Sequence, residues 1–234
     1  MELRTSNSIA NRITYQDWGL IDFFKATEKQ LKLVETIHIE DQPGTIVFCS
    51  HPEIVTIGRA TEPGDLFSWD GPVAEISRGG RATYHGPSQL VIYPIINLKH
   101  SGRPLTEHQN VIGHLRNLEN GIIHWLQTLR IQGQGKTLDA KNRLPQRDYK
   151  GNNVEETGVW VGGKKIASLG IAVKKWVTYH GAAININNDE SAFRGLYPCG
   201  FSNSVMTNVE TILQKKIDLE NEKAVLAKIL VSKL

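Results

Sequence analysis

Apolar positions follow helical spacing in three separate blocks of the chain. In the first block, Leu20, Phe24, Leu31 and Val34 would share one face of an amphipathic helix. The second block is the longest, and the sequence Thr106–Gln109 at its start matches a capping box. The predicted helices span about 19–36, 107–130 and 219–234.

Short runs rich in β-branched residues fill much of the remaining chain. The predicted strands are 13–15, 45–49, 53–57, 73–77 and 90–96, then an antiparallel meander of 158–161, 165–169, 176–179 and 182–186. Residues 131–157 are polar and predict an exposed loop or hairpin. Helices and strands are segregated rather than alternating, and neither a repeat nor a linker is visible. The pattern therefore indicates one α+β domain over 1–234.

Composition narrows the class of protein. The chain has 234 residues, of which 40% are hydrophobic, so it can bury a sizeable core and is not disordered as a whole. The net charge of +3 is too small to indicate nucleic-acid binding. The amino-terminal segment lacks the apolar run of a signal peptide, and no stretch approaches the ~18 apolar residues of a membrane span. We therefore expect a cytoplasmic protein that binds neither nucleic acid nor membrane.

The two cysteines, Cys49 and Cys199, stand in different local contexts. In a reducing cytosol both should be free thiols. Cys49 ends the apolar run Ile46–Cys49, which predicts a small buried core residue. Cys199 lies between Pro198 and Gly200, which mark a turn. A thiol on a turn can be exposed and approached by backbone amides, which favours a reactive thiolate. The alternative is an inert loop cysteine.

A lysine doublet precedes one of the predicted strands. If the strand is regular, Lys165 shares a face with Ala167 and Leu169, whereas Ile166 and Ser168 occupy the other face. A lysine among apolar neighbours loses hydration, which suits acid–base chemistry. The alternative is a solvated lysine in a turn.

Histidines and arginines supply the remaining candidates for site chemistry. His51, His85 and His180 each stand at a predicted strand end, but no ligand pair has the usual zinc spacing, so we expect no metal site. The glycine-rich segment after Arg78 matches neither a Walker A motif nor a dinucleotide fingerprint. Its backbone amides, with Arg78 or Arg81, could bind an anion or a carbonyl oxygen.

Taken together, several ordered segments closely resemble one family, the octanoyltransferases of lipoate biosynthesis, also called lipoyl(octanoyl) transferases. The matching segments are Ser50–Gly58, Arg78–Gln89, Gly158–Val161, Lys165–Gly170, His180–Asn185 and Pro198–Gly200. The resemblance runs from about residue 13 to the closing helix, and the 34-residue separation of Lys165 from Cys199 agrees with the family. Ser88 stands where the family usually has glycine.

The resemblance implies a single catalytic domain like that of biotin- and lipoate-protein ligases, with a large mixed or antiparallel sheet, a smaller sheet and flanking helices. It implies transfer of an octanoyl or lipoyl group from acyl carrier protein to a lysine of a lipoyl domain, the first step of endogenous protein lipoylation. The implied nucleophile is Cys199, and its companion is Lys165. The implied acyl-binding residues are Arg78, Gly79, Gly80, Arg81, Ala82, Thr83, Tyr84, His85, Ser168, Leu169, Gly170, Gly181, Ala182 and Ala183. His51 and His180 would shape the site.

The implied partners are octanoyl-acyl carrier protein and the lipoyl domains of 2-oxoacid dehydrogenase complexes and of the glycine cleavage H protein. Because a thioester donor is already activated, no ATP and no cofactor are needed. We expect a monomer. Two alternatives share the fold: an ATP-dependent lipoate or biotin ligase, and a non-catalytic protein that binds acyl carrier or lipoyl domains. Pro198–Gly200 argues against a ligase, which needs no cysteine.

Overall fold

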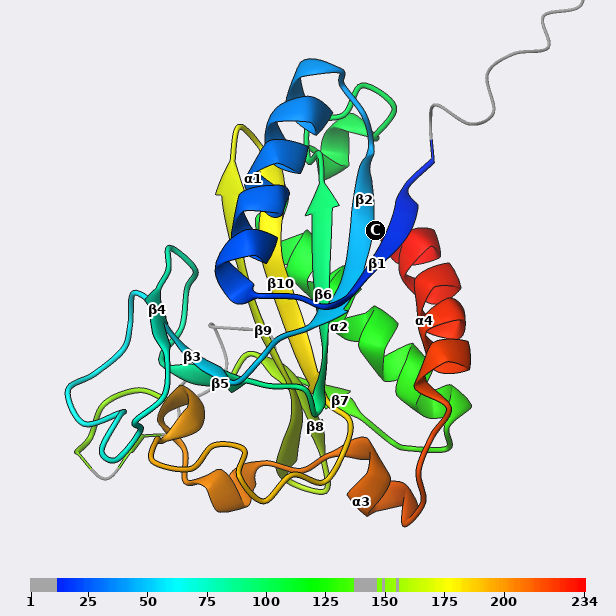
Figure 1. Cartoon of the computed structure of the whole chain (residues 1–234). Helices are drawn as coiled ribbons and strands as arrows, with labels where there is room; N and C mark the ends of the chain where they lie inside the picture. Colours follow the sequence, from blue (N-terminus) through cyan, green and yellow to red (C-terminus); the bar gives the residue numbers. More distant parts are fainter. Residues whose placement is uncertain (1–11, 137–146, 149, 155) are drawn as a thin grey trace, which may run out of the picture.

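A seven-stranded mixed sheet forms the centre of the molecule, with helices on both of its faces (Figure 1). The computed structural model describes residues 12–136, 147–148, 150–154 and 156–234. The strand order is β1-β2-β6-β10-β9-β8-β7, in which β1 runs parallel to β2 and the other neighbours are antiparallel. Its strands are β1 (Thr14–Leu20), β2 (Gly44–Ser50), β6 (Gln89–Ile96), β7 (Gln134–Gly135), β8 (Gly158–Val161), β9 (Lys164–Lys174) and β10 (Val177–Asn185).

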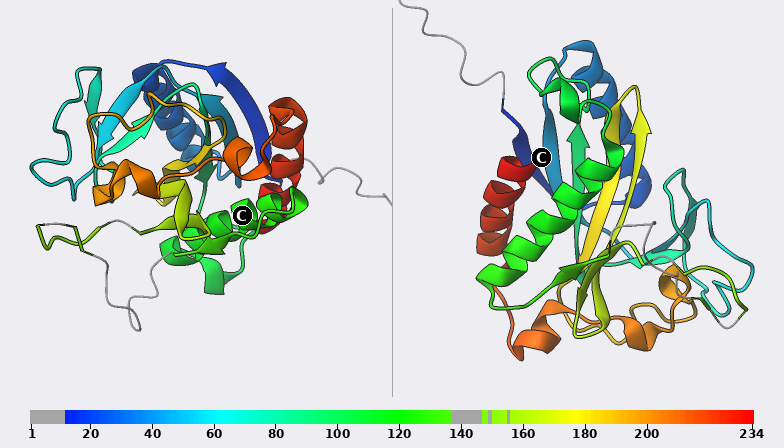
Figure 2. Two further views of the ribbon diagram at one scale, coloured as in Figure 1. Left: turned by 90° about the horizontal axis from the view of Figure 1, so that it is seen from below. Right: turned by 180° about the vertical axis from the view of Figure 1, so that it is seen from behind.

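The helices divide between the two faces of this sheet. Helix α1 (Phe23–Ile39) packs over β6 and β10, whereas α2 (Val111–Thr128) and α4 (Leu219–Lys233) pack on each other across the opposite face (Figure 2). Two apolar cores result, and the central strands feed both because alternate side chains point to opposite faces. In β2, Ile46 packs in the core under α2 and α4, and Val47 packs in the core under α1. The short helix α3 (Val209–Leu213) precedes α4.

A second, smaller sheet lies beside the first and has the order β4-β3-β5. It consists of β3 (Ile54–Ile57), β4 (Val73–Glu75) and β5 (Thr83–His85). Strand β5 lies within the glycine-rich segment, where the sequence predicted no strand, and it pairs antiparallel with β3. The α+β class, with one large mixed sheet, one small sheet and flanking helices, is confirmed.

The predicted helix boundaries shift because the caps differ. Helix α1 begins at Phe23, since the Asp22 side chain accepts a hydrogen bond from Lys25 N at 2.9 Å. Helix α2 is capped by Asn110, whose Oδ1 accepts from Gly113 N at 2.8 Å. The predicted capping box at Thr106–Gln109 is therefore wrong, because its first residues form a separate 3₁₀ turn.

The predicted antiparallel meander is confirmed in β8, β9 and β10, but the two predicted strands 176–179 and 182–186 form one strand, β10. Strands β9 and β10 pair without interruption from Val177↔Lys174 to Ile184↔Ala167, around a two-residue turn at Lys175 and Trp176 with φ of 53° and 63°. The prediction that His180 stands at a strand end is wrong, since it lies inside β10. The 131–157 segment contributes β7, which pairs with β8, and residues 137–146 lie outside the described residues.

Within the described ranges, none of the helices combines the length and the apolar composition that crossing a membrane requires.

Candidate active site

Cys199 lies in a tight 3₁₀ turn, Pro198–Gly200, with left-handed backbone angles of φ 57° and ψ 19°. Its N–H donates to Ala82 O at 2.8 Å, and Gly200 N–H donates to Tyr197 O at 3.0 Å. These bonds hold a conformation that costs a non-glycine residue of order 1–3 kcal/mol, and such strain is concentrated at functional sites. The expectation of an exposed thiol is wrong: Cys199 is 3% exposed, and it borders a pocket.

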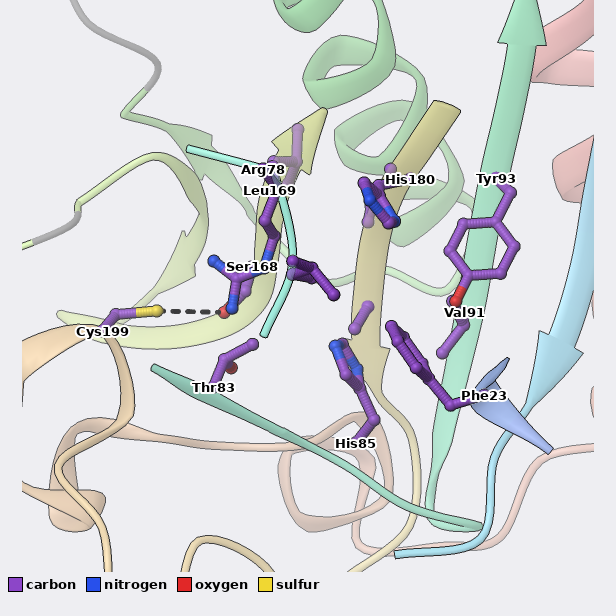
Figure 3. A pocket seen from close by; sticks show the side chains of 15 residues that line it. Phe23, Arg78, Thr83, His85, Val91, Tyr93, Ser168, Leu169, His180 and Cys199 are labelled. Atoms are coloured by element: carbon purple, nitrogen blue, oxygen red, sulfur yellow. Dashed lines mark hydrogen bonds between the residues drawn. The ribbon is translucent and has the colours of Figure 1, made fainter. Parts of the chain in front are cut away.

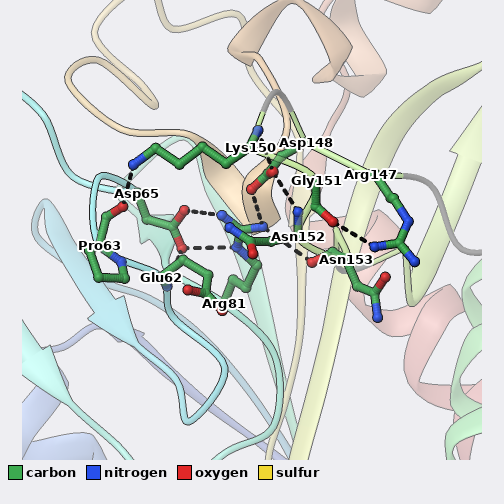
Figure 4. Close-up of polar contacts among 10 residues, drawn as sticks. All are labelled: Glu62, Pro63, Asp65, Arg81, Arg147, Asp148, Lys150, Gly151, Asn152 and Asn153. Atoms are coloured by element: carbon green, nitrogen blue, oxygen red, sulfur yellow. Dashed lines mark hydrogen bonds and ion pairs between the residues drawn. The ribbon is translucent and has the colours of Figure 1, made fainter.

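Next to this turn, Arg81 belongs to a cluster of ion pairs and hydrogen bonds (Figure 4). The Arg81 guanidinium pairs with both carboxylate oxygens of Asp65 and donates to Asp148 Oδ2 at 2.8 Å and Asn153 O at 3.2 Å. The hydrogen bonds to Asp65 raise the pKa of Arg81. A Cβ at Gly200, where φ is +85°, would lie 2.5 Å from Arg81 Nη1. The close approach of Arg81 to the turn therefore explains glycine at this position.

The pocket next to Cys199 runs between β9, β10, β5 and the start of α1 (Figure 3). Ser168 Oγ lies 3.8 Å from Cys199 Sγ at one side. The lining residues are Phe23, Ile76, Arg78, Thr83, His85, Val91, Tyr93, Ser168, Leu169, Gly170, His180, Gly181, Ala182, Ala183 and Cys199.

The lysine doublet separates into one exposed and one buried residue. Lys164 is exposed, whereas Lys165 is 0% exposed, with its Nζ 5.8 Å from the ring centre of Trp160 and 5.9 Å from that of Phe201. Both rings pack in one cluster with Cys199. The fold thus brings the two residues that the sequence singled out, Lys165 and Cys199, to the same apolar cluster.

A β-bulge decides which way Lys165 faces. Val159 pairs with Ala167, but Trp160 pairs with Lys165, so Ile166 is an extra residue in β9. Ile166 and Ala167 both pack in the core under α2, and the bulge turns Lys165 to the face of Ser168. The prediction that Lys165 shares a face with Ala167 and Leu169 is therefore wrong, because it assumed a regular strand.

Gly158 makes room for the Lys165 side chain. A Cβ there would lie 2.9 Å from Lys165 Cε and 2.2 Å from Ala167 O, and its φ is +147°. Only a residue without a side chain fits between these atoms without displacing them.

Arg78 forms part of the pocket wall as a buried cation. Its Nη2 donates to Thr56 Oγ1 at 2.8 Å and to Thr56 O at 3.1 Å, while Nη1 donates to Gly79 O at 2.9 Å.

Burial lowers the pKa of His180 to about 4, and the charge of Arg78 adds to the shift. His180 is therefore neutral at neutral pH.

The other two histidines lie beside Phe23: His51 is buried, and His85 is half-buried and borders the pocket. His51 Nδ1 donates to Ile21 O at 2.7 Å, so its Nε2 accepts from Tyr93 Oη, also at 2.7 Å. His85 lies within reach of Gln89 Oε1 (3.3 Å) and Thr56 Oγ1 (3.5 Å). Burial lowers the pKa of both imidazoles. Among the residues with described positions, no three of His, Cys, Asp and Glu could together hold a metal ion.

Cys49 lies in the core under α1, where burial raises the pKa of its thiol. Cys49 is thus the buried core residue that its local sequence predicted, whereas Cys199 lies in the predicted turn but is buried instead of exposed.

The residues that the resemblance implied for acyl binding occupy two kinds of position. Nine of them border the pocket: Arg78, Thr83, His85, Ser168, Leu169, Gly170, Gly181, Ala182 and Ala183. The other five build its surroundings. Among these, Ala82 O accepts from the Cys199 amide, and Tyr84 Oη donates to Glu53 Oε1 at 3.0 Å. Ser88 lies outside the left-handed backbone region, so a side chain is tolerated there.

Four pocket residues were not anticipated from the sequence. They are Phe23, Ile76, Val91 and Tyr93. Phe23 begins α1, and Val91 and Tyr93 belong to an unbroken apolar strand, so their local patterns match those of ordinary core residues. No local signal distinguishes them, because the packing of α1 on β6, and of the segment after β4 against Phe23, brings them to the pocket.

Comparison with known proteins assigns the family. The lipoyl protein ligase A/B catalytic domain matches residues 22–231. The octanoyltransferase of Bdellovibrio bacteriovorus is 49% identical over 88% of this chain and 92% of its own, and that of Syntrophobacter fumaroxidans is 34% identical over 85% and 80%.

A solved lipoate-protein ligase A bound with ATP has the same fold, with a TM-score of 0.64 over 96% of this chain and 85% of its own, at 17% identity. This chain therefore belongs to the lipoyl protein ligase A/B catalytic domain family and, within it, to the octanoyltransferases, which are acyltransferase enzymes.

Proposed function

We propose that this chain transfers an octanoyl group from the thioester of acyl carrier protein to the amine of a lysine in a lipoyl domain, through an acyl-enzyme on Cys199. The observation that carries this proposal is the position of the Cys199 thiol beside the pocket, with Lys165 next to the Trp160 and Phe201 rings that pack with Cys199. The octanoyltransferase relatives support the acyl group and its use in lipoylation.

The first step exchanges one thioester for another. The Cys199 sulfur attacks the acyl carbonyl carbon, and the carrier's thiol leaves as the carbon–sulfur bond to it breaks. Lys165 takes the proton from Cys199 and returns it to the departing thiol. Because one thioester is made and one is broken, the exchange is close to balanced and requires no ATP.

The second step forms an amide. The amine of the target lysine attacks the acyl-Cys199 carbonyl, and the bond to the Cys199 sulfur breaks. Lys165 removes a proton from the attacking nitrogen and delivers it to the cysteine. Amide formation is downhill from a thioester, so this step drives the overall transfer.

The tetrahedral intermediate of each step carries an oxyanion that needs hydrogen-bond donors. Gly200 N–H already donates to Tyr197 O, which argues against it as a donor. The amides of Gly79, Gly80 and Gly170 are the remaining candidates. Of these three, Gly170 borders the pocket, two residues after Ser168 in β9, so we propose its amide as the donor.

The proposed acceptors are the lipoyl domains of 2-oxoacid dehydrogenase complexes and of the glycine cleavage H protein. We propose further that the chain works as a cytoplasmic monomer and that the whole chain, 1–234, is one catalytic domain. The mild charge of +3 is compatible with an acidic carrier protein.

Incubation with octanoyl-acyl carrier protein and an apo-lipoyl domain, without ATP, tests the transfer. We expect octanoylation of the lipoyl domain, together with a mass gain of one octanoyl group on the enzyme that Cys199→Ala abolishes. Modification that requires ATP and free octanoic acid would instead establish a ligase.

The second alternative is a non-catalytic binding protein. It predicts no adduct on the enzyme under any donor condition and no change in the lipoyl domain, although complexes with either partner would form.

A further inference from the structure

Phe23, the first residue of α1, borders the pocket on the side opposite Cys199 (Figure 3). Phe23 is 3% exposed and packs in a small cluster with Ile54 and Ala74. In the close-up, Phe23, Val91 and Tyr93 lie on the opposite side of the pocket from Cys199. A chain attached to the Cys199 sulfur and lying along the pocket would therefore meet the Phe23 ring at its end.

Two histidine rings hold Phe23 in place. The His85 ring is stacked on it at 6.1 Å between ring centres with an angle of 12°, and the His51 ring meets it edge-on at 5.4 Å. His51 also connects Ile21, just before α1, to Tyr93 in β6 through the two hydrogen bonds of 2.7 Å. The start of the helix is thereby fixed to the large sheet, so Phe23 forms a rigid end wall.

The walls leading to Phe23 suit an unbranched apolar chain. Ala182, Ala183 and Gly170 present little or no side chain to the pocket, which leaves a passage beside the strands. Desolvation lowers the pKa of His85 and His180, so both are neutral at neutral pH. Arg78 in the pocket wall is charged, and its guanidinium is held by hydrogen bonds to Thr56 and Gly79 O.

We infer that Phe23 sets the longest acyl chain that the enzyme accepts, by stopping the methyl end of a saturated chain bound to Cys199. This inference rests on the proposed function and specifies its substrate. Lengthening the chain up to the wall adds buried methylene groups, and a longer chain must displace the Phe23 ring.

The test compares Phe23→Leu and Phe23→Ala with the wild type, using saturated acyl-carrier thioesters of six to fourteen carbons. Phe24→Ala is the matched control, because Phe24 is the next residue of the same helix and is 58% exposed. Acyl-Cys199 formation is followed by intact-protein mass spectrometry for each chain length, and circular dichroism establishes that each variant is folded.

We expect both Phe23 variants to accept chains at least two carbons longer than the wild type accepts. Phe23→Ala should shift the limit further than Phe23→Leu, and Phe24→Ala should leave it unchanged. Each methylene newly accommodated should raise the preference about fourfold, which is the effect of burying one CH₂ group.

The outcomes separate this inference from the proposed function. A wild-type protein that forms no acyl-enzyme with any chain length would overturn the proposed function. A wild type that is acylated, beside a folded Phe23→Leu variant with the same chain-length limit or a uniformly lower rate, would overturn the role of Phe23. If Phe23→Ala does not fold, Phe23→Leu alone decides between these results.

Discussion

Gly181 lies inside β10, and the packing of the large sheet explains why no side chain stands there. A Cβ at this position would lie 2.0 Å from Ile92 O and 2.6 Å from Pro94 Cδ, both in the neighbouring strand β6. Carbon and oxygen in contact normally stay about 3.3 Å or more apart. Because Ile92 O is a backbone atom at the centre of the sheet, Gly181→Ala fits only if β6 and β10 separate locally.

The cost of this separation follows from the strand ladder. If the strands part next to the Ala182↔Ile92 pair, at least one buried N–H and one buried C=O lose their partners. Each unpaired buried group costs about 1–3 kcal/mol, so Gly181→Ala should lower the free energy of unfolding by about 2–6 kcal/mol. For a chain of this size, each kcal/mol lowers the melting temperature by about 2–4 °C, so we expect a fall of roughly 5–20 °C.

Differential scanning calorimetry measures this directly, with Gly79→Ala as the control. Gly79 is also in a segment implied in acyl binding, but a Cβ there meets no atom within 4 Å. The control should melt at the wild-type temperature. The strand-packing explanation is refuted if Gly181→Ala also melts like the wild type while acyl-enzyme formation falls, because the glycine would then serve the acyl chain.

Three further predictions concern the catalytic pair, the second thiol and a buried histidine. Lys165→Met should lower the kcat/KM of octanoyl transfer by roughly 10²–10⁴-fold, because the residue that carries the proton is lost. Lys164→Met, at an exposed position, should leave kcat/KM unchanged. A large loss of kcat/KM in Lys164→Met but not in Lys165→Met would show that the wrong lysine was assigned. Iodoacetamide should alkylate Cys199 in the native protein, because its thiol borders the pocket. It should alkylate Cys49 only after denaturation, since burial raises the pKa of that thiol. Peptide mapping measures both sites, and labelling of Cys49 in the native protein would contradict its burial. Burial lowers the pKa of His114 to about 3, so as the pH falls below about 6.5 the unfolded chain takes up a proton on this histidine before the folded chain does. Protonation should therefore remove about 3 kcal/mol of stability by pH 4. His114→Leu should flatten the dependence of the melting temperature on pH, whereas the control His124→Leu, at an exposed position, should not; equal pH slopes in the two variants would refute the assignment.

Local sequence patterns were sufficient for much of the architecture. The three long helices lie close to their predicted ranges, because apolar residues at helical spacing must bury one face against a sheet. The apolar run 90–96 is a central strand buried on both sides, as its unbroken hydrophobicity indicated. The glycine-rich segment was less informative, since β5 forms there only by pairing with β3.

The site shows where local patterns stop being informative. Alternation along 164–169 placed Lys165 with the core residues, but the extra residue Ile166 inverts the alternation. A bulge has no reliable signature in a single sequence, because it depends on the register of the neighbouring strand. The turn around Cys199 was predictable from Pro198 and Gly200. The burial of its thiol, however, depends on Trp160, which is distant in the sequence, and on Phe201, which lies just outside the Pro198–Gly200 motif.

The sequence by itself determined the α+β class, the long helices, the two candidate residues Cys199 and Lys165, and the family through its ordered motifs. Only the tertiary structure decided that Lys165 lies on the face of Ser168, that Cys199 borders a pocket, and that Phe23 lines this pocket. The physical reason is that spacing along a chain reports which residues share a face of one element. A pocket is made by several elements at once, and its walls depend on strand register and on how α1 packs against the sheet.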